Sequence, residues 1–153
     1  MVRNSEMTKS ASRVDTHQLP QRLILLSEDS QLQASVLLAL GNTPAQIKEC
    51  STLRDAVDCL GSPGLDVVLI DTDLPGLDLT ESLSRIRELS PDAALIVITS
   101  DNSVEMGKQI VEQRVFFYTI KPVNVWEDGA ILEAAWKRLQ NRLGPEKWSR
   151  AIS

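Results

Sequence analysis

Short apolar runs recur along the chain and alternate with segments in which apolar residues are spaced three or four positions apart. Continuous runs are typical of strands covered on both faces, and the wider spacing is typical of amphipathic helices. The expected strands are residues 22–27, 45–50, 65–71, 94–100 and 115–120, the second being more polar, as at a sheet edge. The expected helices are 31–40, 52–60, 79–89, 103–112 and one that starts at Asn124 or Asp128 and ends near Leu143.

Five strands that alternate with five helices predict an α/β fold, in which a parallel sheet carries helices on both faces. Ser30 is expected to cap the first helix. The helix 103–112 has a thin apolar face, made of Val104, Gly107, Ile110 and Val111, so it is expected to be weakly anchored and able to shift. We expect an ordered domain over residues 22–143, a disordered polar leader at 1–21 and a short tail at 144–153.

Length, charge and cysteine content narrow the class of protein. The chain has 153 residues, enough for one domain, and a formal net charge of −5 with a pI near 4.9, which argues against a basic nucleic-acid or membrane footprint. No apolar stretch reaches membrane-spanning length and no signal peptide is visible, so we expect a cytoplasmic location. Cys50 and Cys59 are expected to be reduced, and His17 to be a solvated residue of the leader.

Polar residues stand where the expected strands end. Asp29 follows the first strand, Asp71 ends the third, Thr99 lies at the end of the fourth and Lys121 follows the fifth. The carboxyl ends of parallel strands meet at one edge of the sheet, where ligands bind in open α/β folds. Carboxylates gathered there repel one another, and a hard cation with oxygen ligands, most plausibly Mg²⁺, would relieve this repulsion.

With these residues in place, the chain resembles the receiver domain of two-component response regulators. The resemblance covers residues 22–143, and it is carried by four motifs: the acidic pair Glu28-Asp29, the segment Asp71-Thr72-Asp73-Leu74-Pro75-Gly76-Leu77-Asp78, the hydroxyl in Ile96-Val97-Ile98-Thr99-Ser100, and Tyr118-Thr119-Ile120-Lys121-Pro122. The resemblance implies a flavodoxin-like, doubly wound, five-stranded parallel sheet in the order 2-1-3-4-5.

The resemblance also implies a chemistry. Asp71 would accept a phosphoryl group from a histidine kinase or a histidine phosphotransfer protein. The Mg²⁺ ligands would be Asp29, Asp71 and the backbone carbonyl of Asp73, with Glu28 acting through water. Lys121 would pair with one phosphoryl oxygen.

A conformational switch is implied as well. The Thr99 hydroxyl would donate to the phosphoryl group, and Tyr118 would then swing inward. The readout would be the surface of the fourth helix, fifth strand and fifth helix, which would contact a downstream protein partner or form a self-dimer. The resemblance gives this domain no enzymatic role beyond Mg²⁺-dependent phosphoacceptance and possible self-dephosphorylation.

One segment departs from the family pattern. Residues Arg114-Val115-Phe116-Phe117 replace the usual Gly-Ala turn with its small polar residues. They could lengthen the last strand and pack under the helices, or they could form an apolar contact patch. Trp126 and Trp136 pose the same choice, with helix packing favoured, and Trp148 in the tail could dock on a partner or on the domain itself.

Two other functions compete with a phosphorylatable receiver. A receiver-like interaction module that works without phosphorylation is one. A phosphatase of the haloacid-dehalogenase type is the other, with Asp71 as nucleophile and Asp73 as general acid. Pro75-Gly76 and the position of Asp71 on the third strand argue against that phosphatase.

Overall fold

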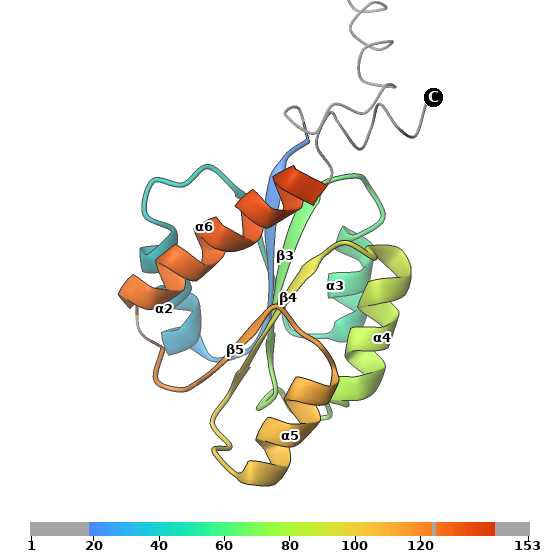
Figure 1. Cartoon of the computed structure of the whole chain (residues 1–153), viewed down its shortest axis with the longest axis vertical. Coiled ribbons are helices and arrows are strands. Elements are labelled where there is room, and N and C mark those ends of the chain that lie inside the picture. Colours follow the sequence, from blue (N-terminus) through green and yellow to red (C-terminus); the bar gives the residue numbers. More distant parts are fainter. Residues whose placement is uncertain (1–18, 124, 143–153) are drawn as a thin grey trace, which may run out of the picture.

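The computed structural model describes residues 19–123 and 125–142 (Figure 1). The strands are β1 (Gln21–Leu26), β2 (Gln46–Cys50), β3 (Leu65–Asp71), β4 (Ala94–Thr99) and β5 (Phe117–Ile120). The helices are α2 (Ser30–Leu40), α3 (Leu53–Cys59), α4 (Leu79–Leu89), α5 (Val104–Glu112) and α6 (Val125–Arg142). Each expected strand and helix is therefore confirmed, and the ends differ from the expected ones by at most two residues.

All five strands are parallel and lie in the order β2-β1-β3-β4-β5. Helices α2 and α6 pack on one face of the sheet, and α3, α4 and α5 pack on the other (Figure 1). The predicted flavodoxin-like topology is thus confirmed. Because the chain enters every strand from the same end, all carboxyl ends meet at one edge of the sheet.

β3 is the middle strand of the sheet, and it is buried along its whole length. All seven of its residues are buried, because the alternating side chains of Leu65–Asp71 face the two apolar layers in turn. Trp136 of α6 is buried as well, and its indole Nε1 donates to the Leu65 carbonyl at 3.0 Å. Helix packing, the favoured role for Trp136, is therefore confirmed.

Two details of the predicted helices are wrong. Asp29, and not Ser30, caps α2, because its side chain accepts hydrogen bonds from the backbone N–H groups of Gln31 and Leu32. In α5, Val104 and Val111 are exposed while Ile110 is buried, so the apolar face is narrower than expected. Helix α6 begins at Val125, which excludes the alternative start at Asp128.

A buried ion pair joins the amino ends of β1 and β3. Arg22 Nε lies 2.6 Å from Asp66 Oδ1, and Arg22 Nη2 lies 3.1 Å from Asp66 Oδ2. The hydroxyl of Ser62 accepts a bond from Arg22, and the hydroxyl of Ser90 donates one to Asp66. Gly64 leaves the room for this arrangement, since a Cβ there would lie 2.5 Å from Arg22 Nε.

Both cysteines are free thiols, as predicted. Burial and the neighbouring Cys59 raise the pKa of Cys50 to about 12, so it stays protonated. In the described ranges no helix is long and apolar enough to cross a bilayer. His17, Trp148, the leader at 1–18 and the end of the chain from 143 lie outside the described residues, as does the side chain of Trp126.

Candidate functional site

Three carboxylates and one ammonium group meet at the carboxyl edge of the sheet. Lys121, just after β5, places its Nζ 2.9 Å from Asp29 Oδ2, 2.9 Å from Asp71 Oδ2 and 3.1 Å from Asp73 Oδ2. Asp29 follows β1, Asp71 is the last residue of β3, and Asp73 lies in the loop after β3. The parallel topology thus brings together four of the predicted site residues.

Asp71 is the most enclosed member of this cluster, with 2% of its surface exposed. Its Oδ1 accepts from the Asp73 backbone N–H at 2.9 Å, and its Oδ2 accepts from the Ser27 hydroxyl at 2.6 Å. Together with the contact from Lys121, these bonds fix the orientation of the Asp71 side chain.

Ser27 is a site residue that the sequence reasoning missed. It is the residue after β1, it is buried, and its Oγ contacts Asp71 Oδ2 while accepting from the Asp29 backbone N–H. Its position at the end of a buried strand was the available signal.

Asp73, the third carboxylate of the cluster, lies in the loop that follows β3. Its Oδ1 accepts from the Ser100 hydroxyl at 2.9 Å, which links the loop after β3 to the end of β4. Gly76 turns this loop with a φ of 77°, a conformation that glycine adopts without strain. The loop is thereby held at the edge of the sheet, beside Lys121.

The hydrogen bonds and ion pairs within the cluster shift the pKa values of three of its members. The bond from Lys121 and those from the α2 backbone lower the pKa of Asp29. Burial acts to raise the pKa of Asp73, but the bonds from Ser100 and Lys121 outweigh it and the pKa is lowered. Burial opposes the charge of Lys121, yet its three carboxylate partners raise its pKa. Asp29, Asp73 and Lys121 are therefore charged at neutral pH.

The donor set suits a hard divalent cation, although an ammonium group stands at its centre. Within the part of the chain that the structure describes, no group of three or more Asp, Glu, His or Cys side chains is arranged to hold a metal by itself. The carboxylate oxygens of Asp29, Asp71 and Asp73 instead converge on Lys121 Nζ. An oxygen-rich site that already gathers around one cation has the chemistry that Mg²⁺ requires.

Glu28 stands apart from the cluster. Its side chain is exposed, and no hydrogen bond or ion pair joins it to the described residues. Its predicted action through a water molecule stays a prediction.

Thr99 is fully buried at the end of β4, and its side-chain hydrogen bonds within the described residues go to partners other than the three carboxylates. Its Oγ1 accepts from the Thr72 hydroxyl at 2.7 Å and from the Asp101 backbone N–H at 3.0 Å. A change in the Thr99 rotamer would therefore alter hydrogen bonds to the loop after β3 and to the loop after β4. This contact with Thr72 is another that the sequence reasoning missed.

Tyr118 lies on β5 and packs, half-buried, against the core beneath α4 and α5. A Cβ on Gly107 of α5 would lie 3.2 Å from its hydroxyl, so the tyrosine hydroxyl lies close to the α5 backbone. Phe116 and Phe117 pack partly on the opposite core layer, which favours the packing role for this segment. Tyr118 thus links β5 to α5, in which Ile110 is the one buried residue.

The charged contacts predict how stability depends on pH. The folded pKa values of Asp29 and Asp73 are lowered, so their contribution is present above the unfolded value of about 3.9 and is lost as the pH falls through the folded values. We expect the free energy of unfolding, measured by urea titration, to fall as the pH drops below about 4. In Lys121→Met this fall should be shallower, and an unchanged slope would contradict the assignment.

Known proteins with a similar sequence are response regulators. A family model described as the response regulator receiver domain matches residues 24–132. The DNA-binding transcriptional regulator NtrC of Escherichia coli strain K12 is 24% identical over 121 residues, which cover 79% of this chain and 26% of NtrC. The chain therefore spans about a quarter of the length of this relative.

Solved structures share the fold. A CheY-like response regulator receiver domain protein from Methanospirillum hungatei JF-1 superposes with a TM-score of 0.69 at 19% identity, covering 80% of this chain and 98% of that one. The beryllofluoride-activated NtrC4 receiver domain dimer gives a TM-score of 0.68 at 22% identity, covering 77% and 98%. At these identities the likeness concerns the fold.

Proposed function

The chain belongs to the response regulator receiver domain family of two-component systems, and from that membership we propose that Asp71 is its phosphoacceptor. The observation that carries the proposal is the contact of Asp71 with Lys121, at 2.9 Å, inside a cluster of three carboxylates. The phosphodonor would be a phosphohistidine of a kinase or of a phosphotransfer protein.

The transfer would proceed by displacement at phosphorus. A carboxylate oxygen of Asp71 forms the new O–P bond while the N–P bond of the donor breaks, and the donor imidazole keeps the electron pair of that bond. No proton is needed on Asp71, in keeping with its bonds to Ser27 and the Asp73 backbone. Lys121 would balance the charge on the phosphoryl oxygens.

The residues that would hold Mg²⁺ are Asp29, Asp71 and the Asp73 backbone carbonyl. When bound, the metal would screen the charges of the carboxylate and the phosphoryl group. For this to happen Lys121 must release the carboxylates and turn toward the phosphoryl oxygens, which makes it the residue that senses the modification. Protons would not compete for the site at neutral pH, because the lowered pKa values keep Asp29 and Asp73 ionised.

The switch would run through Thr99 and Tyr118. The Thr99 hydroxyl, which here accepts from the Thr72 hydroxyl, would donate to a charged oxygen of a phosphoryl group on Asp71, and hydrogen bonds to charged acceptors are the stronger ones. Movement of Thr99 leaves space at the end of β4, and Tyr118 would turn into it, away from Gly107 of α5. The surface of α5, β5 and α6 would then change, with the exposed Val104 and Val111 of α5 at its margin.

Because Tyr118 is the single tyrosine of the chain, this switch can be observed directly. In protein labelled with 3-fluorotyrosine, beryllofluoride and Mg²⁺ should shift the one ¹⁹F resonance. The shift should be lost in Lys121→Ala and in Thr99→Ala, although Lys121→Ala should still accept a phosphoryl group. A wild-type shift in Lys121→Ala would contradict the role given to that residue.

Output partners belong to the same proposal. The NtrC relative is named as DNA-binding, and the NtrC4 receiver neighbour as a dimer. For this chain we propose contact through the α5, β5 and α6 surface, either with a second copy or with a downstream protein. Nucleic-acid binding by this domain itself is not proposed, since its formal net charge is −5.

A module that works without phosphorylation is the second candidate. The observation that favours it is the pair of donors on Asp71 Oδ2, from Ser27 and Lys121, which already satisfies the acceptor without a modification. The dehalogenase-type phosphatase is no longer proposed, because the family match covers both Asp71 and the sheet around it.

A further inference from the structure

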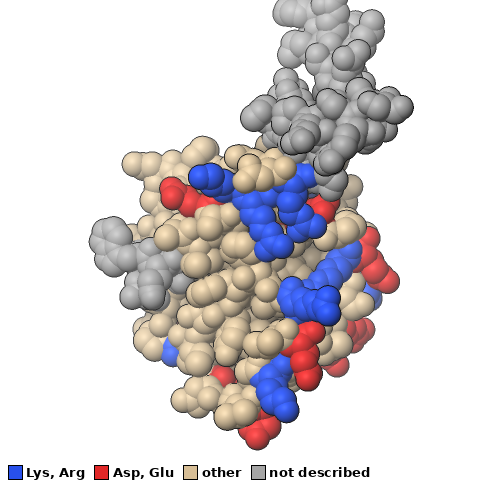
Figure 2. Space-filling model, viewed as in Figure 1, with Lys and Arg blue, Asp and Glu red and all other residues tan. Residues whose placement is uncertain are grey.

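Four arginines surround a cavity at the amino ends of β4 and β5, on the edge of the sheet opposite to Asp71. The cavity has a volume of about 120 Å³. Arg87 comes from the end of α4, Arg114 from the turn before β5, and Arg138 and Arg142 from the last turns of α6. Figure 2 shows Lys and Arg side chains gathered on this face, from the end of α6 toward α4.

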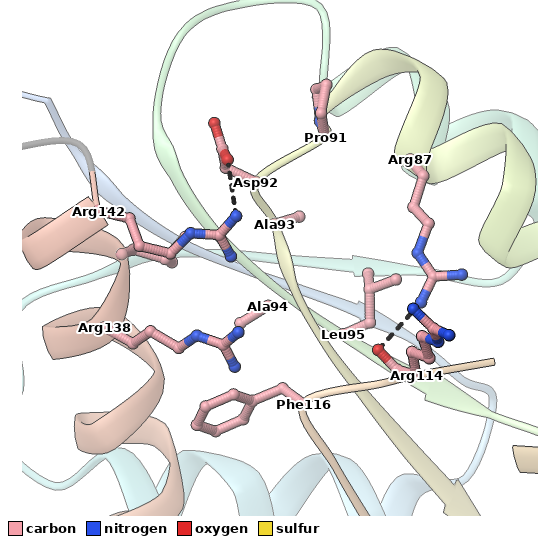
Figure 3. A pocket seen from close by; sticks show the side chains of 11 residues that line it. Arg87, Pro91, Asp92, Ala93, Ala94, Leu95, Arg114, Phe116, Arg138 and Arg142 are labelled. Atoms are coloured by element: carbon pink, nitrogen blue, oxygen red, sulfur yellow. Dashed lines mark hydrogen bonds and ion pairs between the residues drawn. The ribbon is translucent and has the colours of Figure 1, made fainter. Parts of the chain in front are cut away.

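The close view shows how these side chains are arranged (Figure 3). Arg138 and Arg142 approach from α6, Arg87 and Arg114 approach from the other side, and the start of β4 runs between the two pairs. A single carboxylate, Asp92, also lines the cavity, and it lies 3.3 Å from Arg142 Nη2. The lining therefore carries a formal excess of three positive charges, in a chain whose net charge is −5.

Two of the guanidinium groups are held in place by neutral partners. Arg87 donates to the backbone carbonyls of Gln113 and Arg114, and Arg138 lies 5.3 Å from the centroid of the Phe116 ring. Neither contact neutralises the charge. Both reduce the conformational freedom that these side chains would lose when they bind an anion.

Backbone strain is present at the same place. Arg114 has a φ of 56°, and in the described ranges it is the one residue other than glycine with a positive φ. Glycine would adopt this conformation without cost, whereas a long side chain is disfavoured there. Arg114 directly follows the cap of α5, a position where helices often end with a left-handed residue that is usually glycine, so an arginine there keeps a side chain beside the cavity at some cost in backbone energy.

The size and charge of the cavity define what it can take. A volume of about 120 Å³ holds a group the size of a phosphate, and the remainder of a phosphate monoester would lie outside the cavity. Guanidinium groups match phosphate oxygens in pairs, and several guanidinium groups can share one phosphate dianion. A bound dianion would also relieve the repulsion among the four arginines.

We propose that this cavity is a binding site for a phosphate group, supplied by inorganic phosphate or by a small phosphate monoester. It is separate from the phosphorylation site, which lies at the other end of the strands and needs Asp71. Arg87, Arg114, Arg138 and Arg142 would supply the contacts to the phosphate.

The test is a titration of the arginine Nε–Hε NMR signals with inorganic phosphate and, separately, with adenosine monophosphate. EDTA and constant ionic strength exclude metal and general salt effects. We expect saturable shifts of a small set of arginine signals, and binding about tenfold weaker in Arg138→Gln, as for loss of one charged hydrogen bond. Arg85→Gln is the matched control, since Arg85 is an exposed arginine of the same helix as Arg87.

Arg114→Gly separates binding from folding. Glycine relieves the positive φ, so this variant should unfold at the same temperature as the wild type or higher, and yet bind phosphate more weakly. Tighter binding of adenosine monophosphate than of phosphate would identify the monoester as the source, and the reverse would identify free phosphate. Linear shifts without saturation, equal weakening in Arg85→Gln, or tighter binding of a triglutamate peptide would each overturn the proposal.

Discussion

Asp71→Asn should take up no phosphoryl group from acetyl phosphate and Mg²⁺, whereas the wild-type protein should gain one. Asparagine keeps the shape of the side chain and can still accept from the Asp73 backbone, but it has no carboxylate to form the O–P bond. Loss of the nucleophile should lower the rate of adduct formation by more than about a hundredfold. Intact mass spectrometry measures this directly, as one added phosphoryl group per chain.

The controls decide between the two candidate functions. Asp58→Asn alters an exposed carboxylate of α3 and should be phosphorylated as the wild type is. EDTA should prevent the adduct in every variant that otherwise forms it. If the folded wild-type protein formed no adduct under these conditions, the proposal would fail in favour of the module that works without phosphorylation.

Asp66→Ala should lower the free energy of unfolding by about 3–5 kcal/mol, because it leaves the Arg22 guanidinium buried without its carboxylate. Asp66 is 3% exposed and Arg22 is 8% exposed, so water cannot easily replace the lost partner. Ser62 would still accept from Arg22, but a hydroxyl does not balance the charge. Urea denaturation monitored by circular dichroism measures the change.

A paired replacement tests this explanation. In Arg22→Met combined with Asp66→Leu, no buried charge remains, so most of the lost stability should return. The double variant should fall within about 1–2 kcal/mol of the wild type. If it were as unstable as Asp66→Ala, the penalty would come from packing around Gly64 and not from the uncompensated arginine.

The fold was predictable because its signals are local. Each strand is a short apolar run, and β3 is buried along its whole length, so its sequence has few polar interruptions. Parallel strands then place Asp71 and Lys121 at one edge whatever the details of the helices. The ends of the elements and the choice of Asp29 over Ser30 as the cap depend on one hydrogen bond or two, to which apolar spacing is insensitive.

What the sequence could not predict depends on residues far apart in the chain. Ser27 and Asp71 are 44 positions apart, and nothing in the pattern around Ser27 distinguishes it from other small residues at strand ends. The four arginines lie on three separate segments, and only the sheet order brings them around one cavity. Phe116 packs partly on the core, as one of the two predictions had it, but its contact with Arg138 could not be predicted from the sequence.

The opposite positions of the arginines and the carboxylates give the domain an electric polarity along its strands. The amino ends of β4 and β5 carry the positive excess, and the carboxyl ends, near Lys121, carry the negative one. A strand of six residues separates these ends by roughly 20 Å. A charged partner can therefore orient the domain before contact, so encounter rates should fall as salt shortens the range of this field. A phosphate held by the arginines would weaken the same field from its positive end.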